Sequence, residues 1–297
     1  MKIFLTGATG YIGSAVAEAL LAAGHTIAGL ARSAEAVQQI RDRGMTPVQG
    51  DLKSPPGLVP QMAAVDGVIH AGTTNEGHAD ADAVFAMLKA LEDTGKPFVY
   101  TSGIWVIGNT GDRPADESAA VQAPSIVAWR PAVERTVLDA ARQGVRAIVI
   151  RPAIVYGRGG GIPAMFIQSA QESGAARYIG DGMNRWPMVH VEDLADLYVR
   201  AVDRAPTGTL LHAADGSAVR VKEIAEAASF AADAGGRTES WPIDQAREKL
   251  GPLAEALLLD QIVSGDKAKQ TLGWSPRAVG ILDDLRYGSY AMSRINP

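Results

Sequence analysis

The sequence predicts an α/β fold: a doubly wound parallel sheet with a smaller C-terminal lobe. Three observations predict it. Compact apolar runs alternate with helical stretches, most of these runs lie close to a glycine or proline, and the first run leads through a glycine-rich turn into an alanine-rich helix. Repeated strand–helix alternation gives right-handed crossovers, and therefore a parallel sheet that is buried on both faces.

The elements of the main sheet are expected in the first half of the chain. Helices are predicted at 14–23, after the glycine turn, and from about 34 to 43. Compact runs between turn residues predict six strands, at 2–6, 26–30, 46–49, 67–70, 97–101 and 147–151.

The alternation of strands and helices becomes less regular after about Tyr156. Glycine clusters at 157–161 and 180–182 interrupt it, and a strand-like run at 209–212 lies between helices. We expect a main domain at 1–156, to which about 188–213 returns. The smaller lobe is then expected at 157–187 and 214–297.

Composition excludes several classes of function. The 297 residues carry a net charge of −5, which argues against a general attraction to nucleic acid or anionic membranes. The chain contains no cysteine, which excludes disulfides and thiolate chemistry, and its five histidines form no ligand pair, so no metal site is expected. No apolar run approaches the ~20 residues of a membrane span, and no leader sequence is recognisable, so a cytoplasmic protein is predicted.

The glycine turn predicts a dinucleotide site. Residues 6–13 read TGATGYIG between the first strand and the first helix. Gly7 permits the tight turn, Gly10 lets the backbone approach a pyrophosphate, and Gly13 lets the helix pack on the sheet. The phosphates would meet the free N–H groups of the helix N-terminus. This predicts a Rossmann-type domain, and the alternative is a glycine turn without a ligand.

Several further motifs follow in order along nearly the whole chain. They are Gly50-Asp51-Leu52, Val68 to Gly72, Tyr100 to Gly103, Arg151-Pro152 with Val155 to Gly157, His190 to Asp193, and Leu272 to Pro276. With the glycine turn, this ordered set resembles the extended short-chain dehydrogenase/reductase superfamily, which includes the NAD-dependent epimerase/dehydratase proteins.

The resemblance implies a set of cofactor-binding residues. Asp51 and Leu52 would flank the adenine, and the strand end at 70–72 would line the ribose and pyrophosphate. The whole implied set is Gly7, Thr9, Gly10, Tyr11, Ile12, Gly13, Arg32, Ser33, Asp51, Leu52, His70, Ala71, Gly72, Thr101, Arg130, Pro152 and Val155. Without the resemblance, Asp51 is equally a helix cap and His70 a buried strand-end histidine.

The end of the second strand favours NADP(H) over NAD. Enzymes that prefer NAD usually place a carboxylate there, and the similar position here is Ala31. Arg32 and Ser33 follow, and a guanidinium beside a hydroxyl attracts a 2′-phosphate. NAD remains possible if Arg32 stacks on the adenine or lies in solvent.

The usual catalytic set is missing from this alignment. Gly103 occupies the position of the family's serine, Ile126 that of its tyrosine, and Arg130 that of its lysine. Pro131 predicts that the helix begins near Arg130, because proline suits only the first turn. The chain is similar to an atypical subgroup that has basic residues, HxxxR, in place of YxxxK.

Four residues are candidates to replace the missing set. Arg130 would bind an oxygen or the nicotinamide ribose, with a salt bridge to Glu134 as the alternative. Tyr156, or else water, would supply the proton, and Ser102 would hydrogen-bond on the cofactor side. His190 is a further candidate for proton transfer, and the alternative for both Tyr156 and His190 is a structural role.

The substrate side predicts a small, fairly apolar ligand. The family's sugar-nucleotide enzymes tend to place an arginine where this chain has Trp186, with Arg185 one residue earlier. The alternative for this stretch is a packed hinge between the lobes. The loop at 157–161 is expected to be either a lid or an ordinary connector, and Trp105 is expected in a pocket wall.

These features favour an NADP(H)-dependent oxidoreductase that acts on a small carbonyl, enone or imine. The alternatives are a sugar-nucleotide epimerase or dehydratase, and a non-catalytic NADP(H)-sensing protein. The resemblance also implies a homodimer joined by helices near 79–94 and 131–143.

Overall fold

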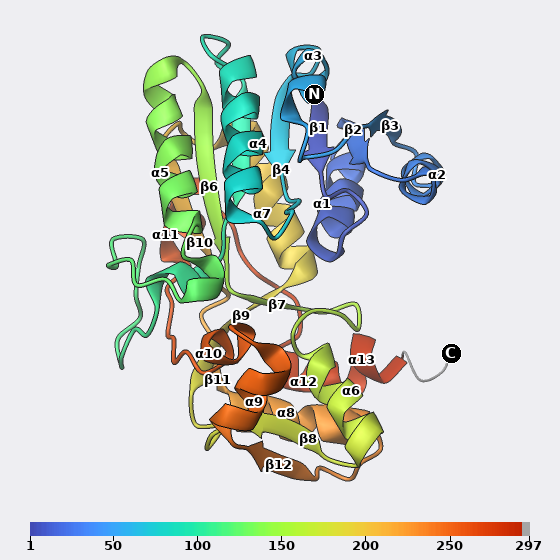
Figure 1. Ribbon diagram of the computed structural model, residues 1–297, viewed down its shortest axis with the longest axis vertical. Coiled ribbons are helices and arrows are strands. Elements are labelled where there is room, and N and C mark those ends of the chain that lie inside the picture. Colours follow the sequence, from blue (N-terminus) through green and yellow to red (C-terminus); the bar gives the residue numbers. More distant parts are fainter. Residues whose placement is uncertain (293–297) are drawn as a thin grey trace.

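A computed structural model describes residues 1–292, and the larger part of the molecule is a seven-stranded parallel sheet (Figure 1). Its strands lie in the order β10-β6-β5-β4-β1-β2-β3. Their bounds are β1 Lys2–Thr6, β2 Thr26–Ala31, β3 Thr46–Gln49, β4 Gly67–His70, β5 Pro97–Thr101, β6 Arg146–Pro152 and β10 Thr209–Ala213. The order reverses beside β1, and such a switch point forms a crevice at the carboxyl ends of the strands.

The period of two along each strand divides the core into two layers. In β1, Ile3 and Leu5 pack on one side of the sheet and Phe4 on the other. Helices α1 (Tyr11–Ala22), α2 (Ala34–Asp42), α7 (Val191–Arg204) and α11 (Asp266–Leu272) contribute to the first layer. Helices α3 (Val59–Ala63), α4 (Gly77–Ala90) and α5 (Arg130–Asp139) contribute to the second.

The smaller lobe has its own core and two short sheets, below the large sheet in Figure 1. One sheet pairs β9 (Arg185–His190) with β7 (Ile154–Tyr156) and β11 (Ala218–Arg220), and the other pairs β8 (Ala176–Ile179) with β12 (Thr238–Trp241). The lobe's helices are α6 Ala164–Ser173, α8 Val221–Ala231, α9 Ile243–Leu250, α10 Leu253–Leu257, α12 Ile281–Tyr287 and α13 Ser289–Met292.

The predicted fold class is confirmed. Four predicted strands have the observed bounds, and the runs at 26–30, 147–151 and 209–212 are each longer by one or two residues. The last of these, β10, pairs in parallel with β6 at the edge of the large sheet. On these pairings we propose the predicted division with its boundary just before β7 rather than at 156, because β7 pairs in the smaller lobe's sheet, and with a return of about 188–213 to the larger part. Within residues 1–292, no helix combines the length and the apolar character that a bilayer crossing requires.

Candidate functional site

The glycine turn fits closely between the first strand and the first helix. Gly7 has a φ of +71°, a left-handed conformation that favours glycine. A Cβ on Gly13 would lie 2.0 Å from the carbonyl oxygen of Gly7, so the helix approaches the turn backbone as only glycine allows. Gly10 is the N-cap of α1 and carries no side chain to cover the helix's free N–H groups. These groups therefore remain available to an anion.

A cavity of about 660 Å³ opens above this turn, at the carboxyl ends of the strands. It brings together twelve of the residues assigned to the cofactor, which come from four separate segments of the chain. They are Gly7, Thr9, Gly10, Tyr11, Ile12, Gly13, Arg32, Ser33, Asp51, Leu52, Ala71 and Gly72. A pocket of this size suits a cofactor, and its glycine backbone suits phosphates.

Two residues assigned to the cofactor, His70 and Thr101, line neither this cavity nor the second one described below. His70 is buried behind the turn, where its Nδ1 lies 2.8 Å from Oγ1 of Thr6 and its ring stacks on Tyr100. Burial lowers the pKa of His70 to about 4, so the ring is neutral. Thr101 shares a 2.6 Å hydrogen bond with the hydroxyl of Tyr198. His70 therefore has the structural role that was the alternative.

The adenosine end of the cavity contains a carboxylate that the sequence did not single out. Arg32 is exposed there, and Ser33 caps α2 by accepting from the backbone amide of Ala36. Glu35, in the first turn of α2, also lines the cavity, and hydrogen bonds from Ser33 and its own backbone lower its pKa. Acidic residues are common in the first turn of a helix, so Glu35 did not stand out in the sequence as a binding residue. Asp51 accepts from the amide of Lys53 and caps no helix.

A second cavity, of about 290 Å³, adjoins the first, because Tyr11 and Ile12 line both. It gathers five further candidates from three segments: Ser102, Trp105, Arg130, Pro152 and Val155. The Ser102 side chain is buried, and its Oγ has no hydrogen-bond partner within the described part of the chain. A buried hydroxyl without a partner is costly, and this one belongs to a residue that lines the cavity.

The start of helix α5 places Arg130 at the second cavity. Helix α5 begins at Arg130 with Pro131 in its first turn, as predicted, and Ile126 lies before it in a 3₁₀ turn at Ser125–Val127. The Nη1 of Arg130 donates to the carbonyl of Thr101 (2.9 Å), and the guanidinium lies 4.7 Å from the centre of the Trp129 ring. These contacts orient the guanidinium at the wall of the second cavity.

The alternative salt bridge between Arg130 and Glu134 is wrong. Glu134 instead binds Arg151 in two buried hydrogen bonds, Nε to Oε1 at 2.9 Å and Nη2 to Oε2 at 2.5 Å. The partner lies on β6, beneath the helix, so Glu134 faces the sheet and leaves Arg130 free to face the cavity.

The structure corrects the proposed role of Tyr156. Its side chain is buried in the smaller lobe, lines neither cavity, and donates to the carbonyl of Val279 (2.8 Å). His190 packs edge-on against it at 5.1 Å, and its Nδ1 accepts from the amide of Glu192 as the N-cap of α7. Burial raises the pKa of Tyr156, which makes it a weaker acid still. Both residues are structural here.

The glycine loop at 157–161 is anchored on both sides. The hydroxyl of Tyr11 donates to the carbonyl of Gly157 (2.8 Å), whose amide donates to the hydroxyl of Tyr290 (3.0 Å). Arg158 forms ion pairs with one glutamate of α1 and one of α7. The loop is therefore an ordered connector in this structure, and the lid interpretation finds no support here. Residues 1–292 also contain no group of acidic or histidine side chains that could hold a metal ion.

Comparison with known proteins assigns the family. A family model described as the NAD dependent epimerase/dehydratase family matches residues 3–212. The chain belongs to the NAD-dependent epimerase/dehydratase family. Reductases and epimerases are both found among its relatives.

Two relatives of this chain and one solved structure of similar fold are examples of the proteins that it resembles. An uncharacterized protein of Schizosaccharomyces pombe is 35% identical, over 98% of this chain and all of its own length. A ketoreductase of Stigmatella aurantiaca, named for a farnesyl dihydroquinoline oxide, is 26% identical over 93% of this chain and 92% of its own. The structure of the dTDP-glucose 4,6-dehydratase DesIV of Streptomyces venezuelae, solved with NAD bound, covers all of this chain and 98% of its own, with a TM-score of 0.82 at 19% identity.

Proposed function

We propose that this epimerase/dehydratase-family chain is an NADP(H)-linked oxidoreductase that reduces a small, fairly apolar carbonyl, enone or imine. The observation that carries the proposal is the junction of the two cavities at Tyr11 and Ile12. A dinucleotide on the glycine turn would extend its nicotinamide end past these residues, toward the orphan hydroxyl of Ser102 and the guanidinium of Arg130.

The residues of the second cavity can bind and polarise an acceptor. A reduced nicotinamide, when bound, supplies a hydride. Arg130 uses Nη1 on the Thr101 carbonyl, and its remaining N–H groups can hold the acceptor's oxygen or nitrogen, since a guanidinium stays protonated. The Ser102 hydroxyl can donate a second hydrogen bond to the same atom. Both donors stabilise the negative charge that develops there.

Water is the proton source in this proposal. The phenol that lines the cavity, Tyr11, donates its hydroxyl hydrogen to Gly157, and burial raises its pKa. A positioned general acid contributes roughly 10²–10⁴ in rate, whereas holding the two reactants together can contribute about 7–11 kcal/mol. The site therefore suits activated acceptors, such as enones and imines, better than unactivated ketones. The ketoreductase name of the Stigmatella relative supports an apolar acceptor.

Reduction is tested with NADPH and a panel of enones, imines and ketones, by loss of the reduced nicotinamide's absorbance. We expect turnover of at least one activated acceptor. In Arg130→Met, kcat should fall on the order of a hundredfold because an oxyanion donor is lost. The control is Arg135→Met, which removes an exposed arginine from the same helix and should leave kcat unchanged. Tight NADPH binding without turnover of any acceptor would instead identify an NADP(H)-sensing protein.

NADP(H) is the proposed coenzyme because Arg32 and Ser33 line the adenosine end of the first cavity. Arg32→Ala should weaken NADPH binding about tenfold, the value of one exposed charge-assisted contact, and leave NADH binding nearly unchanged. Glu35→Gln should strengthen NADPH binding, since it removes a negative charge close to a 2′-phosphate. Calorimetric titration with both coenzymes measures these effects. An Arg32→Ala variant that keeps the parent's preference would transfer the assignment to NAD.

Assembly and location stay predictions. A homodimer would use α4 and α5, and Phe85 on α4 offers an apolar contact because 64% of it is exposed. A cytoplasmic location is part of the same proposal.

A further inference from the structure

A third cavity, of about 490 Å³, lies within the smaller lobe. Its walls come from α6, β8, β12 and α9, whose packing is visible at the bottom of Figure 1. Its lining combines apolar side chains, among them Met165, Phe166, Trp186, Trp241 and Leu250, with the polar Gln168, Ser169 and Ser173 and three charged residues. A cavity of this size, with an aromatic and aliphatic part, suits a small molecule that carries an apolar group.

The third cavity lies beside the second one. Ile162, just before α6, lines both of them. The proposal requires the two cavities to join at Ile162, so that one molecule places a reactive group beside Arg130 and extends past Ile162 into the smaller lobe. We propose that the third cavity binds an apolar chain or ring system of the substrate, an inference that rests on the proposed reductase function.

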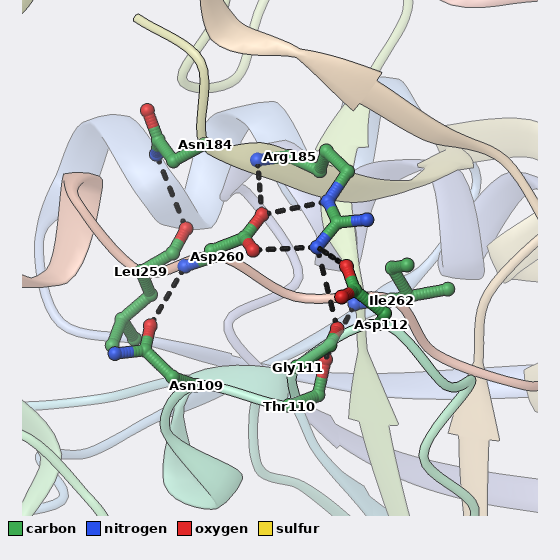
Figure 2. A network of polar contacts seen from close by, with 9 residues as sticks. All are labelled: Asn109, Thr110, Gly111, Asp112, Asn184, Arg185, Leu259, Asp260 and Ile262. Atoms are coloured by element: carbon green, nitrogen blue, oxygen red, sulfur yellow. Dashed lines mark hydrogen bonds and ion pairs between the residues drawn. The ribbon is translucent and has the colours of Figure 1, made fainter. Parts of the chain in front are cut away.

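The contacts of the Arg185 side chain argue against a sugar nucleotide in this cavity. Figure 2 shows its guanidinium turned to Asp260, with Nε to Oδ1 at 2.9 Å and Nη2 to Oδ2 at 2.6 Å, and to Asp112 at 3.1 Å. The backbone amide of Asp260 donates in turn to the side chain of Asn109. Arg185 therefore ties β9 to the loop at 109–112 and lines none of the three cavities.

Trp186 takes the adjoining position in the cavity wall. It is buried, and its indole nitrogen donates to the carbonyl of Leu257 (3.2 Å), so that its one donor is used. It therefore offers a ligand an aromatic surface and no polar contact.

The charged side chains around the cavity do not form an anion site. Arg177 is paired with Glu239 at 2.9 Å, and Lys249 and Glu172 oppose each other in sign. A diphosphate requires several converging donors, whereas these charges largely cancel. The cavity is therefore selective for apolar groups.

The test separates binding from turnover. The neutral dye N-phenylnaphthylamine should gain fluorescence with the parent and be displaced by dodecanone but not by UDP-glucose. Leu250→Lys places a charge in the wall and should weaken dye binding about tenfold or more. Val279→Lys, an exposed apolar residue outside the cavity, is the matched control and should bind as the parent does. Thermal unfolding of both variants establishes that they are folded.

The kinetic arm uses vinyl ketones from but-3-en-2-one to dodec-1-en-3-one with NADPH, because the site is proposed to favour activated acceptors. For the parent, kcat/KM should rise by up to about fourfold for each added methylene until the cavity is filled. Leu250→Lys should flatten this rise. Ile162→Trp, which narrows the junction, should have the same effect.

The outcomes distinguish the two proposals. Parent protein that does not bind the dye, a folded Leu250→Lys variant that binds it equally well, or displacement by UDP-glucose would each overturn the apolar site. Dye binding that behaves as expected, with no turnover of any ketone, enone or imine, would support the apolar site and overturn the reductase function.

Discussion

Gly13→Ala is expected to abolish dinucleotide binding. The added Cβ would lie 2.0 Å from the carbonyl oxygen of Gly7 and 2.7 Å from its carbonyl carbon, and both are backbone atoms that no rotamer change can move aside. Helix α1 must therefore shift away from the turn, and its N-terminal N–H groups leave the positions in which they face the phosphates. We expect at least a hundredfold loss of NADPH affinity by calorimetry, and overpacking should also cost about 1–3 kcal/mol of stability.

Gly57→Ala is the matched control. A Cβ there meets no atom within 4 Å, and the residue's φ is not in the left-handed region. This variant should bind NADPH and unfold as the parent does. A Gly13→Ala variant with the parent's affinity would show that the glycine turn does not hold the coenzyme, and the proposed function would fail with it.

Removing the carboxylate of Glu134 should destabilise the whole larger part of the molecule. Glu134 and Arg151 are almost completely buried, with 5% and 4% of their side chains exposed. Glu134→Ala would leave the guanidinium buried without a counter-charge, which costs about 3–5 kcal/mol. The neighbouring His212 cannot replace the carboxylate, because an imidazole carries no negative charge, and burial and the charge of Arg151 lower its pKa to about 3, so that it is neutral. Urea unfolding measures the change.

Two further variants make this result specific. Glu92→Ala breaks an exposed pair with Lys89 and should cost no more than about 1 kcal/mol. The double variant Glu134→Leu with Arg151→Met removes both charges and should recover most of the lost stability. If Glu134→Ala unfolds at the same urea concentration as Glu92→Ala, the buried pair contributes nothing. Since α5 begins at Arg130, the destabilised variant should also lose activity.

The catalytic candidates show where prediction from the sequence reached its limit. The helix start at Arg130 was predictable, because proline at its second position acts within one turn. The partner of Glu134 was not predictable from the sequence. Helical spacing favoured Arg130, one turn earlier on α5, whereas the structure pairs Glu134 with Arg151 on β6. Ligands of parallel α/β sheets bind at the carboxyl ends of the strands, and Tyr156 does end a strand. That strand, however, belongs to the smaller lobe's sheet. Its hydroxyl therefore points to Val279, which lies 123 residues further along the chain.

The sequence by itself determined the features that depend on neighbouring residues: the strands, the glycine turn and the start of α5. Backbone sterics and short hydrophobic periods act locally, so they can be read in order along the chain. Only the tertiary structure decided which side chains face a cavity. The removal of Tyr156 and His190 from the site, the pairing of Arg185 with Asp260, and the apolar cavity beyond Ile162 all come from contacts between distant segments. Such contacts depend on how the two parts pack, and no local pattern specifies them.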